Sequence, residues 1–152
     1  MDIYYQSDKF KQLLRRYEEL QEDNISEFLD PEELTDVAEY YHYIGEDNKA
    51  LEAVDYAIHM YPTATIPLSF KARLALFCND DPQLADEIAE MIVDKTDLDY
   101  LYLKAEIMIV DNRAAEADDF LQSQYDAIIS QEDREDYVLD VAALFSDYEE
   151  TE

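Results

Sequence analysis

The sequence predicts an all-α fold built from antiparallel helix hairpins, and three observations lead to this prediction. The chain of 152 residues contains one Gly and four Pro, which is too few for a β-sandwich with many tight turns. Apolar residues recur at helical spacing along its length. Similar segments also recur about 34 residues apart, which is the length of one two-helix unit. A chain of this length buries about 68–70% of its unfolded surface, so we expect a packed core.

The expected helices begin at recognisable N-terminal signals. Asp30 precedes Pro31 and Asp81 precedes Pro82, and each pair places an N-cap residue before a proline in the first helical turn. Ser130 opens a capping-box pattern that carries an aspartate at its last position. The predicted helices span residues 7–23, 31–44, 48–60, 66–78, 82–94, 98–110, 114–128 and 131–148.

The first predicted hairpin turns at Gly45, the only glycine of the chain. A residue just after a helix end often needs a positive φ angle, which glycine adopts without steric cost. Alanines at the helix crossing let two backbones approach to about 8–10 Å. The residues expected on the facing sides are Leu34, Val37, Ala38 and Tyr41 in the first helix and Ala50, Val54, Ala57 and Ile58 in the second. The tyrosines expected to fill helix interfaces are Tyr40, Tyr41 and Tyr56.

Two pairs of matching segments carry the repeat. FKARLAL at 70–76 matches LKAEIMI at 103–109, a spacing of 33 residues. LTDVAEYY at 34–41 matches VLDVAALF at 138–145, a spacing of 104 residues, which is close to three periods of 34–35. Alanines mark two phases of this repeat: Ala38, Ala72, Ala105 and Ala142 in one, and Ala50, Ala85 and Ala117 in the other.

The net charge narrows the classes of partner. The chain has 39 acidic and 11 basic residues, a net charge of −28; residues 1–16 carry +2 (four basic, two acidic), so the remainder carries −30. Such a surface repels phosphate groups, so we expect no direct binding to nucleic acid and none to anionic membranes.

The single cysteine, Cys78, is expected to be a buried, inert thiol. One cysteine, no signal-peptide pattern and no apolar run of about 20 residues together favour a cytoplasmic protein.

The first hairpin resembles the tetratricopeptide repeat (TPR) family. The residues that carry the resemblance are Leu34-x2-Val37-Ala38-x2-Tyr41, followed by Ala50-x3-Val54, Ala57 and Pro62. The spacing is that of the family, although Leu replaces its Trp and Val replaces its Phe. The later copies place Lys71 and Lys104 where the family has an apolar residue. Two alternatives stay open for these positions. Either the apolar parts of the two lysine side chains are buried while their ammonium groups reach solvent, or Phe70 and Leu103 are buried in place of the lysines.

The resemblance implies a right-handed α-α superhelix, a TPR-like solenoid, that forms a single domain over residues 1–152. Its parts are an N-terminal helix or cap (1–30), three repeats (31–64, 65–97 and 98–130) and the first helix of a partial fourth repeat (131–148). The last helix has an apolar face with Val138, Val141, Ala142 and Phe145, and three interpretations of it stay open. The chain is the N-terminal part of a longer repeat protein, helices 7–23 and 131–148 cap its ends, or two copies form a homodimer through this face.

The same resemblance implies a function. In TPR proteins the first helix of each unit lines a groove that receives a segment of another protein. We therefore expect a non-enzymatic protein–protein interaction module, or scaffold, that binds a protein or peptide with apolar and basic residues and needs no cofactor. The candidate partner-binding residues are Glu39, His42, Tyr43, Arg73, Phe77, Tyr102 and Glu106, and Leu76, Ile109 and Val110 belong to the same predicted groove. The alternative for Phe77, Ile109 and Val110 is packing on neighbouring helices.

Catalytic and metal sites are not expected. Glu39 and His42 have the carboxylate–imidazole spacing of di-iron helical bundles, but such a site needs two of these motifs. The other histidine, His59, has Tyr56 at the corresponding position.

The alternative to a peptide-binding module is an acidic nucleic-acid mimic or inhibitor that occupies a basic protein surface, and this prediction rests on the charge alone. Binding by such a mimic falls steeply with salt, whereas groove binding persists in part.

Overall fold

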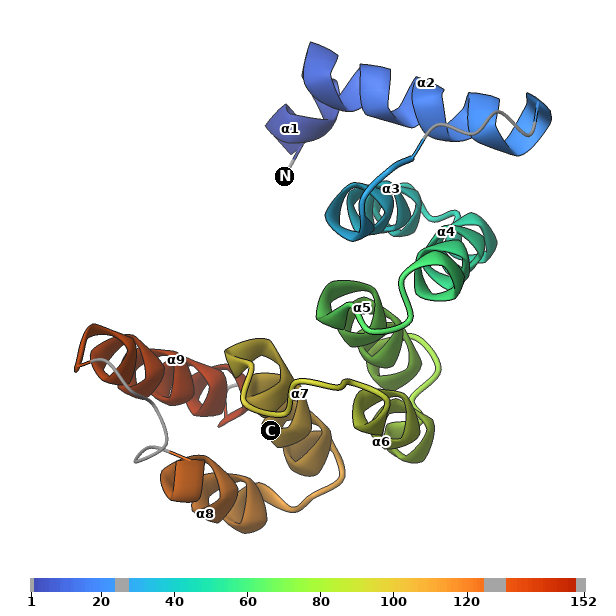
Figure 1. Cartoon of the computed structure of the whole chain (residues 1–152). Helices are drawn as coiled ribbons and strands as arrows, with labels where there is room; N and C mark the ends of the chain where they lie inside the picture. The colour runs from blue at the N-terminus through green and yellow to red at the C-terminus, as the bar shows by residue number, and fades with distance from the viewer. Residues whose placement is uncertain (1, 24–27, 125–130, 150–152) are drawn as a thin grey trace. The chain divides into compact units, whose positions relative to one another are not determined.

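The computed structural model describes residues 2–23, 28–124 and 131–149 (Figure 1). Within these ranges the regular secondary structure is entirely α-helical, which confirms the all-α prediction. The helices are α1 (Asp2–Gln6), α2 (Asp8–Asp23), α3 (Pro31–Tyr43), α4 (Asp47–Met60), α5 (Thr65–Phe77), α6 (Pro82–Glu90), α7 (Leu98–Val110), α8 (Ala114–Gln124) and α9 (Gln131–Glu149). They belong to two compact units, Met1–Lys71 and Ala72–Glu152, and the boundary between the units falls within α5.

Where the structure describes them, the predicted helix bounds agree to within one residue except in two places. A short helix, α1, precedes α2, and it was not predicted. Helix α6 ends at Glu90 rather than at residue 94, and the Lys95 side chain folds back over this end. The Lys95 ammonium donates to the backbone oxygens of Glu90 at 2.9 Å and Ile92 at 3.0 Å. Residues 125–128, the predicted end of another helix, and the capping box opened by Ser130 lie outside the described residues.

In unit 1, α3 and α4 form the predicted hairpin. Helix α3 starts with a complete capping box, in which the Glu33 N–H donates to Asp30 Oδ1 at 2.7 Å and the Asp30 N–H donates to Glu33 Oε1 at 3.1 Å. These bonds satisfy backbone donors that a helix start leaves unpaired. The side chains that meet between the two helices are fully buried: Leu34, Val37, Ala38, Ala50, Val54 and Ala57.

The turn between α3 and α4 confirms the role of Gly45. Its φ angle is +83°, and an added Cβ atom would have no neighbour within 4 Å, so the position requires glycine for its backbone conformation alone. The Glu46 N–H then donates to the Tyr41 carbonyl oxygen at 2.7 Å. Helix α7 ends in the same way, because Asn112, two residues after its end, has a φ angle of +61° and the Arg113 N–H donates to the Met108 carbonyl oxygen at 2.7 Å. The end of α5 differs, because the residue with positive φ, Asp80 at +51°, lies three residues after Phe77.

Aromatic rings fill the remaining core of unit 1. Phe10 is buried, and its ring centroid lies 5.0 Å from those of both Tyr5 and Tyr40. Tyr41 is buried beside the Tyr17 ring, 6.3 Å away. Tyr40 and Tyr56 are partly buried against the same cluster, so the interface role predicted for these tyrosines is confirmed.

In unit 2, α7 packs against α6, α8 and α9 (Figure 1). Leu103 is fully buried, and Lys104 keeps only 12% of its side chain exposed while its ammonium pairs with Asp86 and, at 2.8 Å, with Glu90. The two alternatives predicted for the third repeat segment therefore occur together: Leu103 is buried, and so is most of the Lys104 side chain. Tyr137 of α9 is buried against α8, and its hydroxyl donates to the Leu121 carbonyl oxygen.

Candidate functional site

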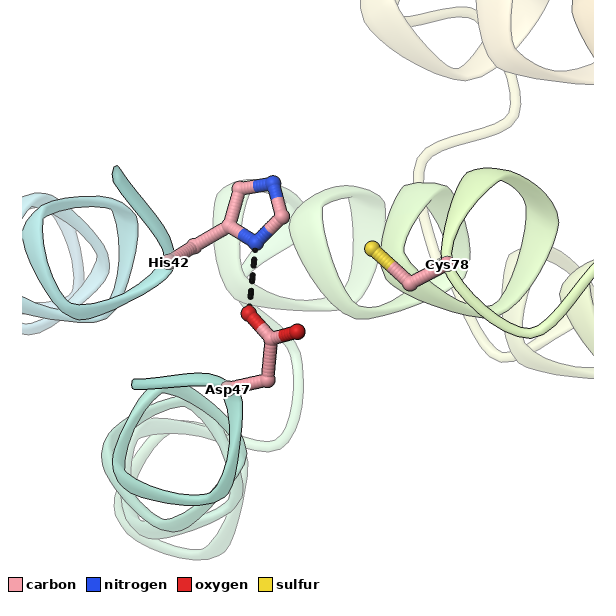
Figure 2. Close-up of side chains that lie close together, drawn as sticks. All are labelled: His42, Asp47 and Cys78. Carbon is pink, nitrogen blue, oxygen red and sulfur yellow. Dashed lines mark hydrogen bonds and ion pairs between the residues drawn. The ribbon is translucent and has the colours of Figure 1, made fainter. Parts of the chain in front are cut away.

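Three candidate residues of unit 1 lie in the second half of α3. Glu39 is half-buried, whereas His42 and Tyr43 are exposed. The His42 Nδ1 atom lies 2.9 Å from Asp47 Oδ1, and Figure 2 marks this interaction with a dashed line. The centroid of the His42 ring lies 6.4 Å from that of the Phe70 ring, in an edge contact. These contacts hold the imidazole over the hairpin turn and leave it accessible to solvent.

Tyr43 is the most accessible aromatic residue of this group. Its side chain is 55% exposed, although one side of its ring lies 5.3 Å from the Tyr5 ring. The ring is therefore supported by a neighbour while more than half of the side chain is accessible to solvent. A supported, exposed aromatic ring is a typical anchor for a protein partner.

Cys78, also labelled in Figure 2, belongs to unit 2 and is exposed. The prediction of a buried thiol is therefore wrong. The reason is local: Phe77 ends α5, and the chain leaves the core there to enter the turn at Asp80. Leu76, one residue before Phe77, is 1% exposed and belongs to the core, so the prediction that it lines a groove is also wrong.

The candidate residues Arg73 and Glu106 of unit 2 contact each other. Arg73 Nε lies 3.3 Å from Glu106 Oε2, and Arg73 Nη1 lies 3.1 Å from Asp99 Oδ1. The Glu106 side chain is only 16% exposed. The sequence analysis missed Asp99, but the opposite charges at matching positions of the two repeat segments were a signal for the Arg73–Glu106 pair.

Burial shifts the pKa values of Glu106 and Arg73. It raises the pKa of Glu106 above its ordinary value, and the Arg73 guanidinium reverses only part of that rise. Burial lowers the pKa of Arg73, but the carboxylates of Glu106 and Asp99 outweigh it and raise that pKa overall. Arg73 thus stays charged and is occupied by two carboxylates, so the cluster orders α5 against α7 within unit 2.

Tyr102 is committed to the packing of α9 on α7. Its hydroxyl donates to Asp140 Oδ2 at 2.8 Å, and its ring stacks on the Tyr137 ring at 6.0 Å. Burial, followed by the hydrogen bond to Asp140, raises the pKa of Tyr102.

Phe77, in contrast to Tyr102, is exposed: its side chain is 53% accessible at the end of α5. The remaining two groove candidates, Ile109 and Val110, are partly buried.

The comparisons with known proteins add no family. Neither the protein-family models, nor the curated proteins, nor the solved structures contain a match to this chain. The TPR resemblance therefore stays a prediction. In the part of the chain that the structure describes, no helix combines the length and apolar character needed to cross a bilayer.

Proposed function

We propose that this protein is a non-enzymatic interaction module with a TPR-like solenoid fold, which works in the cytoplasm by binding a cationic segment of another protein. The regular helix ends support the fold. Helices α3, α5 and α7 each run 13 residues, and each is followed within three residues by a residue with positive φ: Gly45, Asp80 and Asn112. A recurring helix length followed by a sharp turn is typical of a tandem hairpin repeat.

The observation that carries the function is the exposure of Tyr43 and Phe77. They are the last residues of α3 and α5, 34 positions apart, and their side chains are 55% and 53% exposed. About half of each side chain is thus accessible to a partner, and aromatic anchors dominate protein interfaces. The net charge of −28 favours a positively charged partner, which it attracts over long range.

Affinity capture from the source cell tests this proposal. The tagged chain is compared with Tyr43→Ala and Phe77→Ala, and Met60→Ala serves as a matched control because Met60 is also an exposed apolar residue, at a helix end. We expect both aromatic variants to lose at least about fivefold of the captured partner, equivalent to about 1 kcal/mol, and the control to retain it.

Repeating the capture at high salt separates the proposal from the acidic mimic. Contacts through aromatic rings persist in part when charges are screened, whereas purely electrostatic binding collapses. Capture that is lost at high salt and is indifferent to Tyr43 and Phe77 would contradict the proposed function and favour the mimic.

A further inference from the structure

Helix α9 has an apolar surface on each of two sides. On the inner side Tyr137 is buried, and Val141, Leu144 and Phe145 are partly buried against the core that includes Ala105, Ala117 and Leu121. On the outer side Val138 is 53% exposed and Leu139 is 68% exposed, and Ala142 is exposed as well. The predicted apolar face is thus divided, because Val141 and Phe145 turn inward while Val138 and Ala142 turn outward.

The matching segment of α3 shows what this outer side does when it is covered. LTDVAEYY at 34–41 aligns with VLDVAALF at 138–145, so Leu34 corresponds to Val138 and Ala38 to Ala142. Leu34 and Ala38 are fully buried in one core cluster with α4. The α4 residues of that cluster are Ala50, Val54 and Ala57 at spacing i, i+4, i+7, together with Ala53. Among the described residues, α9 has no counterpart of α4 on its outer side.

The charge of this part of the chain indicates which partner the surface can accept. Residues 114–152 contain 13 acidic residues and one basic residue, a net charge of −12, and α9 itself carries the exposed residues Asp136 and Asp140. A second copy of the chain would bring the same negative charge and would be repelled. A helix that combines an apolar face with positive charges complements both the apolar strip and the net negative charge of this segment.

We infer that the outer side of α9, formed by Val138, Leu139 and Ala142, binds a cationic amphipathic α-helix of a partner protein. The helix places small apolar residues at spacing i, i+4, i+7 against Ala142, as α4 does against Ala38. The inference rests on the proposed protein-binding function, but it uses residues other than Tyr43 and Phe77.

The probe for the test is taken from α4 itself. It is a fluorescein-labelled peptide of residues 47–60 that carries Asp47→Lys, Glu52→Lys and Asp55→Lys, which makes its charged face basic and keeps Ala50, Val54 and Ala57. Fluorescence anisotropy with the full chain should give saturable binding. The same peptide with Val54→Asp should bind at least about tenfold more weakly, because its apolar face is broken. Absence of saturable binding to the wild-type chain would overturn the inference.

Variants of the protein locate the binding surface. Leu139→Gln should raise the Kd at least about tenfold, whereas Leu51→Gln, a matched change of an exposed leucine on α4, should leave it within about twofold. Ala142→Leu should also weaken binding, because it adds apolar area but blocks the close approach of the helix. Equal binding by wild type and Leu139→Gln, or tighter binding by Ala142→Leu, would overturn the inference.

Two further outcomes separate this inference from competing accounts. Light scattering that shows a wild-type dimer, converted to a monomer by Leu139→Gln, would overturn it in favour of a second copy. The capture experiment keeps the two proposals apart. If capture depends on Tyr43 and Phe77 but peptide binding is the same in wild type and Leu139→Gln, the α9 inference alone is overturned. If, in addition, capture does not depend on Tyr43 and Phe77, the proposed function is overturned as well.

Discussion

Arg73 and Glu106 lie 33 positions apart in the chain, yet Arg73 Nε is 3.3 Å from Glu106 Oε2. The two residues hold the same position in the matching segments FKARLAL and LKAEIMI. A residue of α5 therefore contacts the residue of α7 that corresponds to it in the sequence match, and the two residues carry opposite charges. Asp99, 3.1 Å from Arg73 Nη1, completes the cluster.

Loss of the guanidinium should destabilise unit 2. In Arg73→Met the apolar stem is kept, but Glu106 is left without its partner at 16% exposure. A partly buried carboxylate without its partner costs about 1–3 kcal/mol. Urea denaturation followed by circular dichroism measures the loss. Arg113→Met is the control, since Arg113 pairs with exposed Asp111 and Glu116, and its effect should stay within about 0.5 kcal/mol. Equal effects of the two variants would contradict a structural role for the Arg73 cluster.

Asp36 should make stability fall with rising pH. Burial raises its pKa in the folded chain above the ordinary value, although the Tyr4 hydroxyl, 3.0 Å away, lowers it in part. The folded state therefore holds the Asp36 proton more tightly than the unfolded state does. The free energy of unfolding decreases as pH rises from the unfolded pKa through the folded pKa. Asp36→Asn should gain stability relative to wild type across that window and keep a constant gain above it, as urea denaturation at several pH values would show. Parallel pH profiles of the two proteins would refute this role.

The ion pair of Lys104 with Glu90 should make the free energy of unfolding rise with pH, opposite to the effect of Asp36. The hydrogen bond from Lys104 lowers the pKa of Glu90, so this pair stabilises the folded state above the ordinary Glu pKa and loses its effect as pH falls through the lowered one. Lys104→Met should cost at most about 1 kcal/mol at pH 7, because Glu90 and Asp86 are themselves almost half exposed and can be hydrated. The cost should disappear in strongly acidic solution. A cost that grows on acidification would contradict the assigned ion pairs.

Gly45 should be needed for its backbone and not for space. Gly45→Ala should lower the free energy of unfolding by about 1 kcal/mol, since φ is +83° and no atom lies near an added Cβ. Gly45→Asn should cost less, because asparagine tolerates the left-handed conformation that Asn112 adopts after α7. Thermal unfolding of the two variants gives the comparison. If asparagine costs as much as alanine, the loss does not come from backbone strain.

Local signals in the sequence were sufficient to predict the all-α class and most of the helix bounds. Asp30 and Asp81 mark helix starts because their side chains accept hydrogen bonds from the first turn, and these contacts involve residues only three positions away. The end of α6 was not predictable from such local signals. At this end the Lys95 side chain, which lies beyond the helix, donates hydrogen bonds to the backbone oxygens of Glu90 and Ile92. Helix ends that depend on a side chain beyond the helix leave no periodic pattern.

The candidate site was harder to predict, because apolar periodicity does not decide which of two adjacent apolar residues faces the core. Leu76 and Phe77 are neighbours of similar hydrophobicity, and the structure buries the first and exposes the second. The same ambiguity applies to α9, where burial of Tyr137 turns Val138 outward. Tertiary packing resolves both cases, and a single sequence does not record it.

Site-specific photo-crosslinking tests the central claim most directly. The photoreactive residue p-benzoylphenylalanine is placed at position 43 or 77 and, as controls, at the exposed positions of Leu51 and Met60. The account predicts that positions 43 and 77 crosslink to the same cationic protein in the source cell, and that the two control positions do not. Crosslinks of equal strength at all four positions, or none at positions 43 and 77, would contradict it.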